Sequence, residues 1–208
     1  MGILAEPAQF IRELKLKGGF SVCELGDQFL TFTDPHRLAI DWYKERGCAR
    51  YESIDGNARG TRTFDLNEPV RGMGTFTLVT DFGTGEHVFN QAMVWVTMHD
   101  LCEVGGYIAF DRPISGYPGH GYYLIDPCLV RDIAHANEYE VVRLEEGDTK
   151  RGRLVRGIWR KAKEGAFVYP QMGRYKKLLR PITATPEELA RYEAKRKKKL
   201  ARALMRSR

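Results

Sequence analysis

The chain has 208 residues, of which 43% are hydrophobic and 29% are charged, and this size and composition suit one α/β domain whose core needs no disulfide or metal support. No apolar run approaches the roughly 20 residues that span a bilayer, and the first residues lack a basic stretch followed by a long apolar one, so we expect a cytoplasmic protein without a membrane span. The net charge of +6 is unevenly divided: residues 1–146 hold 13 Lys and Arg against 22 Asp and Glu, whereas residues 147–208 hold 20 against 5.

Segments with the patterns of strands and helices alternate along the chain. The expected strands, in chain order, are residues 20–25, 50–55, 63–66, 75–80, 107–111, 140–144 and 154–159. The expected helices are residues 7–17, a segment from Asp34 to Gly47, a segment between Gly85 and Gly105, and residues 126–137. Strands that alternate with helices predict a mostly parallel sheet with right-handed crossovers, and the last two strands predict an antiparallel hairpin at its edge.

Four of these strands end in acidic residues. Glu24, Asp55, Asp65 and Asp81 each stand where an apolar stretch ends. In an open parallel sheet, ligands bind beyond the carboxyl ends of the strands, so the four carboxylates should face one crevice. The pattern predicts one binding site rather than scattered surface charge.

Five motifs carry a resemblance to a known family. In chain order they read VCELGDQ, SIDGN, FDLN, FTLVTDFGTGEHVFNQ and MHDLCEVGGYIAF. Over roughly residues 18–160 the chain resembles the Rossmann-like class I S-adenosylmethionine-dependent methyltransferases, especially a subgroup with a Glu-His pair after strand four and a Gly-His-Gly-Tyr loop after strand five. The resemblance implies a methyltransferase domain over residues 1–181, S-adenosylmethionine as the cofactor, and an α/β fold with a seven-stranded sheet whose last hairpin is reversed.

The turn after the first strand would face the methionine part of the cofactor. Glu24, Gly26, Asp27 and Gln28 form this turn, and Gly26 permits close approach where a Cβ would intrude. The common pattern of the family has two or three glycines here, whereas this chain keeps only Gly26. A degenerate cofactor site, with Glu24 as a capped strand end, therefore stays open as an alternative.

Two further acidic positions would hold the rest of the cofactor. Asp55 lies at the end of strand two, where a carboxylate can accept hydrogen bonds from both ribose hydroxyls. By the resemblance, Asp65 and Leu66 would lie beside the adenine, with Asp65 accepting from its exocyclic amine. Ordinary turn chemistry is the alternative for both carboxylates, since Asp55 precedes Gly56-Asn57 and Asp65 can be a cap or loop residue.

The transferred methyl group should emerge at the end of strand four. Asp81 and Phe82 would contact the cofactor there, and His87 would lie in the first turn of the next helix, whose dipole tends to keep an imidazole neutral. We expect His87, or Asp81, to act as general base for a hydroxyl or ammonium acceptor, with a structural or solvent-exposed histidine as the alternative. No metal-ligand set is evident in the sequence, so we expect transfer without a metal.

A loop rich in Gly and Pro follows strand five. Residues 112–121 are a long connection for a compact domain, and such loops are often functional. We expect His120, Tyr117 and Tyr122 to form a lid or wall for the substrate. An inert connection is the alternative.

The basic end forms a separate segment. Residues 182–208 are expected to contain a helix that begins at Thr185-Pro186, and its run from Lys195 to Lys199 has no apolar side chain. Such a helix cannot be core. Residues 186–208 should therefore project into solvent, contact an acidic protein partner or bind nucleic acid without sequence specificity.

Three functions remain in view. The resemblance favours methyl transfer to a polar small molecule or sugar-like acceptor by in-line displacement. A non-catalytic descendant, acting as an interaction or assembly module through the basic helix, would account for the glycine-poor turn. A nucleic-acid methyltransferase would account for the basic end, but residues Asp81 to Thr84 lack the aromatic-Pro motif typical of DNA enzymes that methylate amino groups.

Overall fold

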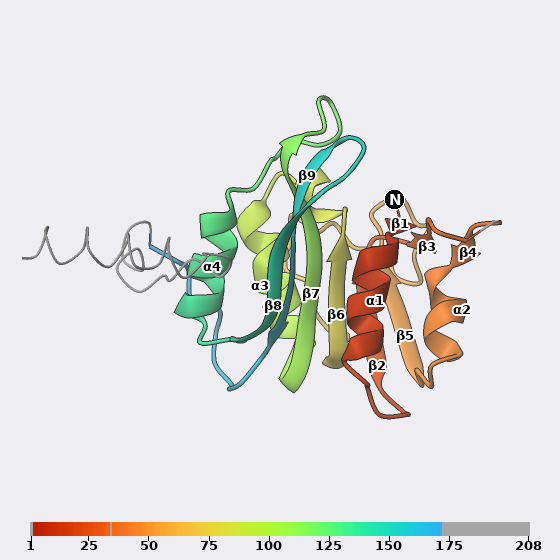
Figure 1. Ribbon diagram of the computed structural model, residues 1–208. Coiled ribbons are helices and arrows are strands. Elements are labelled where there is room, and N and C mark those ends of the chain that lie inside the picture. Colours follow the sequence, from red (N-terminus) through yellow and green to blue (C-terminus); the bar gives the residue numbers. More distant parts are fainter. Residues whose placement is uncertain (1, 34, 172–208) are drawn as a thin grey trace, which may run out of the picture. The chain divides into compact units, whose positions relative to one another are not determined.

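The computed structural model describes residues 2–33 and 35–171, which form a six-stranded sheet with helices on both faces (Figure 1). The expected domain boundary at residue 181, the basic helix over 182–208 and the partner segment 186–208 lie outside the described residues. No helix in the described ranges is long and apolar enough to cross a membrane.

The main sheet is mostly parallel and ends in an antiparallel hairpin. Across the sheet, the strands are β5 (Arg50–Ile54), β2 (Ser21–Leu25), β6 (Phe76–Phe82), β7 (Cys102–Gly116), β9 (Gly152–Arg160) and β8 (Glu140–Asp148). The first four are parallel to one another, whereas β9 is antiparallel to both of its neighbours. This arrangement confirms the α/β fold class and brings the carboxyl ends of β5, β2 and β6 side by side.

Helices cover the two faces of this sheet. Their bounds are α1 (Ala5–Glu13), α2 (Ala39–Lys44), α3 (Gln91–Leu101) and α4 (Pro127–Ala136). α1 and α2 pack with Val22 and Leu78 on one face, and α3 and α4 pack with Leu25 and Val79 on the other. Side chains of consecutive strand residues point to opposite faces, so both faces of β2 and β6 are buried, polar residues included.

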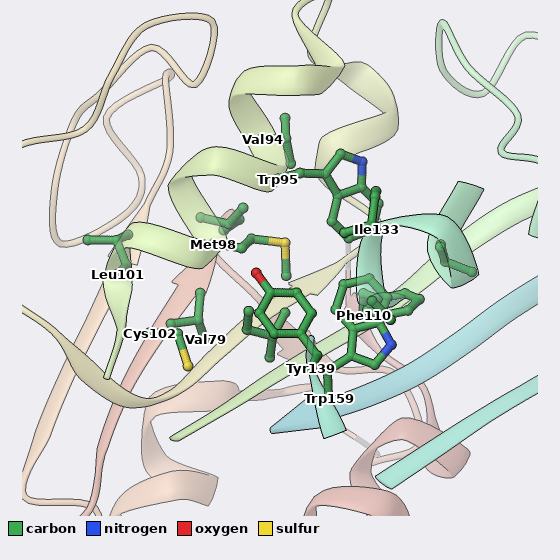
Figure 2. Packing of buried hydrophobic residues seen from close by; sticks show 14 of the residues in the cluster. Val79, Val94, Trp95, Met98, Leu101, Cys102, Phe110, Ile133, Tyr139 and Trp159 are labelled. Atoms are coloured by element: carbon green, nitrogen blue, oxygen red, sulfur yellow. The ribbon is translucent and has the colours of Figure 1, made fainter. Parts of the chain in front are cut away.

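An aromatic cluster fixes the strands that carry the site (Figure 2). The ring centroid of Phe110 on β7 lies 5.5 Å from Trp95 of α3 and 4.5 Å from Trp159 of β9, and Tyr139 stacks on Trp159 at 5.3 Å. A Cβ at Gly157 would clash with the Phe110 ring, so this position requires glycine. Each buried aromatic side chain contributes about 1.5–3 kcal/mol through removal from water, and the cluster therefore anchors β7 firmly to α3 and β9.

The third expected strand does not form, so the main sheet of the described residues has six strands rather than seven. Near residues 63–66, one isolated parallel bridge joins Ile54 and Arg62 in the part of the chain that the structure describes. The physical reason is a local turn: Asp65 Oδ1 accepts a hydrogen bond from Asn67 N at 2.9 Å, which bends the chain away from an extended course.

The second helix begins later than the sequence predicts. Residues Arg37–Leu38 form β4, which pairs antiparallel with β3 (Phe29–Leu30), and β3 in turn pairs with β1 (Gly2–Ile3). α2 therefore starts at Ala39. The expected cap residue at position 34 lies outside the described chain.

The helix expected after Gly85 is divided in two. Gly85–His87 form one 3-10 turn, η1, and Val88 then has an extended backbone. α3 begins after Asn90, whose side chain accepts a hydrogen bond from Met93 N at 3.2 Å. His87 therefore does not lie in the first turn of a long helix, and Phe89, expected to face inward, is 74% exposed.

Candidate active site

Two cavities open beside the carboxyl ends of the parallel strands. Cavity A, of about 540 Å³, lies beyond β5, and its lining includes Asp55, Asp65, Leu66, Thr84 and His87. Cavity B, of about 530 Å³, lies beyond β6 and β7, and its lining includes Phe82, Glu86, Asp111, Tyr117, His120, Lys150 and Arg151. Glu86 and His87 are neighbours in η1 but line different cavities, so η1 stands at the border between A and B.

Asp55 lies on the wall of cavity A directly after β5. Its Oδ1 accepts a hydrogen bond from Asn57 N at 3.0 Å, and its Oδ2 accepts one from Asp27 N at 3.3 Å. Asp55 therefore makes the turn hydrogen bond that was the alternative to a binding role. A carboxylate has about four acceptor positions, so Asp55 can accept further hydrogen bonds from a ligand without giving up this turn.

Asp65 and Leu66 lie across cavity A from Asp55, on the loop that replaces the third strand. Asn67 donates to Asp65 Oδ1 from its backbone N at 2.9 Å and from its Nδ2 at 2.7 Å, and these hydrogen bonds lower the pKa of Asp65. Leu66 is 5% exposed and supplies apolar surface beneath the cavity. This pair offers a flat ligand an acceptor at its edge and an apolar contact on its face.

The turn after β2 is filled by side chains of the protein itself. Gly26 has a φ of +87°, and a Cβ there would clash with Thr84 Oγ1. Gln28 Nε2 donates to Leu25 O at 3.2 Å and to Thr84 Oγ1 at 3.1 Å. Thr84, rather than a ligand, therefore makes the close approach to the backbone that Gly26 permits.

The backbone donors of the same turn also have internal partners. Gly26 N donates to Ile54 O at 2.6 Å, and Asp27 N donates to Asp55 Oδ2. Gln28 is buried, and neither it nor Gly26 belongs to the lining of cavity A or B. A ligand that used the turn's N–H groups would have to displace these contacts.

Glu24 lies below this turn, within the sheet. Its side chain is fully buried, Tyr51 Oη donates to its Oε2 at 2.5 Å, and burial raises its pKa to about 8. Glu24 does not line cavity A or B. This burial favours the structural interpretation of Glu24, a capped strand end, over a contact with the cofactor.

Asp81 anchors η1 from below. Its Oδ1 accepts hydrogen bonds from Thr84 N at 3.1 Å and Gly85 N at 2.9 Å, and its Oδ2 pairs with Arg112 Nη1. Asp81 and Arg112 are both completely buried. Gly85 must be glycine here, because a Cβ would clash with the Arg112 guanidinium. Both oxygens of Asp81 are thus occupied, which leaves this carboxylate poorly placed to take a proton from an acceptor.

Three titratable side chains meet at the border of the two cavities. Glu86 Oε1 lies 3.4 Å from His120 Nε2, and the rings of His87 and His120 are 4.8 Å apart at a steep angle. Burial raises the pKa of Glu86 to about 7, opposed by Arg112. Burial, and then the neighbouring His120 and Arg112, lower the pKa of His87, so its imidazole is neutral at pH 7 and able to accept a proton.

The loop after β7 carries His120 into the site. Tyr122 N donates to Glu86 O at 2.9 Å, and a Cβ at Gly121 would lie only 3.0 Å from that oxygen. Tyr117 Oη lies 2.7 Å from Thr149 Oγ1 in the β8–β9 turn. Tyr117 and His120 line cavity B, whereas Tyr122 is 73% exposed and lines a smaller hollow on the other side of the loop.

Cavity B contains charged groups of both signs. Asp111 on β7 pairs with Arg156 at 3.2 Å, and burial raises the pKa of Asp111 to about 6 despite this partner. Asp111 Oδ1 is buried without a hydrogen-bond partner among the described residues. Lys150 and Arg151 lie in the same lining. Cavity B thus combines these charged groups with the apolar side chains of Leu4, Phe29, Phe82 and Leu154.

Sequence reasoning missed the roles of Glu86, Asp111 and Arg112. The signal available was the charged pair Asp111-Arg112 inside an otherwise apolar strand, because charged residues in a buried strand require partners. The convergence of Glu86 with His120, 34 positions apart, needs the fold to be known.

Comparison with known proteins gives structural relatives only. No family model matches the sequence, and no curated protein matches it. Among solved structures, the N-methyltransferase NodS from Bradyrhizobium japonicum WM9, crystallised with S-adenosyl-L-homocysteine, is similar with a TM-score of 0.57 and 13% identity, over 76% of this chain and 86% of that one.

Two further solved structures are similar to this chain. The 1,6-didemethyltoxoflavin-N1-methyltransferase of Burkholderia thailandensis, with bound 1,6-didemethyltoxoflavin and S-adenosylhomocysteine, has a TM-score of 0.54 at 16% identity, over 76% of this chain and 77% of that one. A putative methyltransferase from Bacillus halodurans has a TM-score of 0.55 at 11% identity, over 76% of this chain and all of that one. The chain has the class I, Rossmann-like fold of S-adenosylmethionine-dependent methyltransferases.

Proposed function

We propose that this protein transfers a methyl group from S-adenosylmethionine to a small polar acceptor. One observation carries the proposal: cavities A and B meet at η1, where Glu86 faces one and His87 faces the other. Cavity A would hold the donor, and cavity B would hold the acceptor. Relatives of the same fold are crystallised with S-adenosylhomocysteine, and this supports the choice of donor.

Cavity A has groups suited to an adenosine. Asp55 would accept hydrogen bonds from the ribose hydroxyls, while Asp65 would accept from the adenine amine and Leu66 would contact the ring. Phe82 and Gly83 lie in the lining of cavity B, next to the strand end from which the methyl group would emerge.

The chemistry requires alignment more than acid catalysis. A sulfonium cation becomes a neutral thioether as its methyl leaves, so a pocket that excludes water and holds donor and acceptor in line lowers the barrier. An acceptor hydroxyl or ammonium must also lose a proton, and His87 is the candidate to accept it. Asp81 is not a candidate for this role, because its two carboxylate oxygens are bound to Arg112 and to two backbone N–H groups.

The chemistry of cavity B supports a polar acceptor. Asp111, Lys150, Arg151 and His120 offer both positive and negative partners, and Tyr117 supplies a ring of the kind that packs on a sugar or heterocycle.

A second candidate, a non-catalytic module, is favoured by one observation. The N–H groups of Gly26 and Asp27 are used within the protein, and Gln28 and Thr84 fill the turn that would contact the donor's methionine part. If this turn does not reopen, the fold cannot hold the donor.

Calorimetric titration of the full chain with S-adenosylhomocysteine, at two salt concentrations, separates the two candidates. We expect a dissociation constant on the order of 10 μM that does not depend on salt. Asp55→Ala should weaken binding more than about 100-fold, since two hydrogen bonds to a charged acceptor are worth about 3 kcal/mol or more. Asp41→Ala, which removes an exposed carboxylate on α2, is the matched control and should bind normally. No heat with the wild-type chain would favour the non-catalytic module, and an unchanged affinity in Asp55→Ala would reject the assigned role of Asp55.

A further inference from the structure

Three side chains with metal-binding atoms converge at the border of the cavities. Glu86 and His87 come from η1 and His120 from the loop after β7, and one ligand atom of each lies within 4.8 Å of the others. Two of these atoms, Glu86 Oε1 and His120 Nε2, are 3.4 Å apart. Ligands about 2.1 Å from a tetrahedral zinc ion are themselves about 3.4 Å apart, so this pair already has the spacing of two zinc ligands.

The arrangement is held in place by the backbone. Tyr122 N donates to Glu86 O at 2.9 Å, and His120 N donates to Tyr117 O at 3.1 Å. Gly121 lies so close to Glu86 that a Cβ would approach its Cγ to 3.0 Å. The loop therefore holds His120 against Glu86 at little further entropic cost when a ligand binds.

Two polar atoms in the group have no hydrogen-bond partner among the described residues. They are Glu86 Oε2 and His87 Nε2, and the Glu86 side chain is only 2% exposed. Buried polar atoms are rarely left without partners, so each such case requires an explanation. Glu86 Oε2 lies 3.6 Å from Arg112 Nη1, so the atom that a bound cation would explain is His87 Nε2.

The nearby Arg112 does not neutralise the group. Its guanidinium pairs with Asp81 and donates to Gln91 Oε1 at 2.5 Å, while its Nη1 stays 3.6 Å from Glu86 Oε2. Asp81 balances the charge of Arg112. Glu86 Oε1, the oxygen that faces His120, is therefore the one available to a cation.

We infer that Glu86, His87 and His120 form a binding site for a divalent transition-metal ion of the zinc type. Two imidazoles and one carboxylate are a typical ligand set for a catalytic zinc ion, and imidazole favours zinc and cobalt over magnesium and calcium. Three protein ligands leave a fourth position open. Glu86 and His120 line cavity B, so that position would face the acceptor.

This step rests on the proposed function. In it, the metal site would give His87 a different role. An acceptor hydroxyl bound at the fourth position would lose its proton to water, because the ion stabilises the alkoxide. The alkoxide oxygen would form the new C–O bond as the C–S bond breaks, and the electron pair of that bond would stay on the sulfur. His87 would then be a ligand instead of a free base.

Cobalt spectroscopy on the full chain tests the site. The protein is treated with a chelator, dialysed and titrated with Co²⁺, all in a Cys128→Ser background so that the exposed thiol cannot contribute. We expect one Co²⁺ per chain, with the visible bands of a four- or five-coordinate ion, displaced by Zn²⁺ and not by Mg²⁺. His120→Gln should weaken binding more than about tenfold, since loss of even an indirect partner of a metal ligand has an effect of this size.

The control is His36→Gln, which removes an exposed histidine whose Nδ1 lies 3.0 Å from Thr33 O, and it should leave Co²⁺ binding unchanged. The spectrum of the Cys128→Ser protein, in which all three ligands are intact, does not depend on whether His120→Gln folds. Absence of the bands, or equal binding by wild type and His120→Gln, would overturn the metal site. Titration with S-adenosylhomocysteine in the absence of metal stays a separate test, so the metal site and the proposed methyl transfer can fail independently.

Discussion

Arg112 is the residue on which the site's geometry depends most. Its side chain is completely buried, it pairs with Asp81, and it donates to Gln91 Oε1 while lying over Trp95 at 5.5 Å. Through Asp81 the same contacts hold η1, since Asp81 accepts from Thr84 N and Gly85 N. Removal of one partner of a buried ion pair leaves an uncompensated charge, which costs more than the pair itself contributes.

Arg112→Met should therefore lower the free energy of unfolding by about 3–5 kcal/mol, measured by urea denaturation. The double variant Asp81→Leu/Arg112→Met should recover part of this loss, because the Asp81 charge is no longer buried without a partner, while Thr84 N and Gly85 N lose their acceptor. Arg62→Met is the comparison: it breaks the Arg62–Glu52 pair, in which Arg62 is 56% exposed, and should cost less than about 1 kcal/mol. Equal losses in Arg112→Met and Arg62→Met would contradict this account.

Glu24 makes stability depend on pH. Burial raises its pKa from 4.5 to about 8, so between these values the folded chain keeps a proton that the unfolded chain has released. The stability contributed by the protonated group is thus complete below pH 4.5 and is lost as the pH rises toward 8. Glu24→Gln removes this titration while leaving an oxygen that can accept from Tyr51 Oη.

We expect the unfolding free energy of Glu24→Gln to increase relative to that of the wild type from pH 5 to pH 8, measured by urea denaturation at each unit of pH. Glu86 and Asp111 also have raised pKa values, but they are common to both proteins and cancel in the difference. Parallel pH profiles for the two proteins would show that Glu24 ionises in the folded state as readily as in the unfolded one.

At the scale of elements, the loop over residues 63–67 takes the place of the expected third strand and forms one wall of cavity A. Asn67 joins it to the start of α3: its Oδ1 accepts from Asn90 N at 2.9 Å, and its backbone O accepts from Asn90 Nδ2 at 3.1 Å. Asn67 therefore joins this end of the loop both to Asp65 and to Asn90, the cap residue of α3. This fixes one wall of cavity A without a ladder of strand hydrogen bonds.

Asn67→Ala should weaken binding of S-adenosylhomocysteine about five- to tenfold while leaving the fold intact. The variant loses the side-chain hydrogen bonds to Asp65 and Asn90, each worth about 1 kcal/mol, so the loop samples positions in which Asp65 no longer faces the cavity. Calorimetry gives the affinity and circular dichroism gives the fold. Asn57→Ala, also in the lining of cavity A, removes a side-chain acceptor for Arg59 N but keeps the hydrogen bond from Asn57 N to Asp55, and it should have a smaller effect.

The elements differ in how far the sequence predicts them, for physical reasons. β2, β6 and α4 follow from local patterns: β2 and β6 are short stretches rich in apolar and β-branched residues, and α4 has an Asp-Pro cap before an amphipathic stretch. Residues 63–66 have a strand-like composition, but the Asx turn at Asp65 prevails over it. In the site, strand-end carboxylates predict Asp55 and Asp65, whereas the group of Glu86 with His120 depends on a long-range contact that no local pattern records.

At the scale of the whole molecule, positive charge is concentrated at the C-terminal end. In the β8–β9 hairpin the basic side chains are largely paired, Arg153 with Glu146 and Arg160 with Glu140. Residues 186–208, in contrast, hold nine Lys and Arg against three Glu. The net charge of +6 therefore reflects this end of the chain more than the described fold.

We predict weak nucleic-acid binding through residues 186–208, without sequence preference. Phosphate contacts release condensed counterions, so affinity should fall steeply between about 50 and 200 mM salt. Fluorescence anisotropy with labelled duplexes of two unrelated sequences measures this, and a chain ending at residue 185 should lose the binding while keeping its affinity for S-adenosylhomocysteine. Equal retention of the duplexes by the shortened chain would rule out the basic end as the cause. Binding that differs between the two sequences would instead indicate base recognition, which a run of lysines cannot provide, because phosphate contacts carry no sequence information.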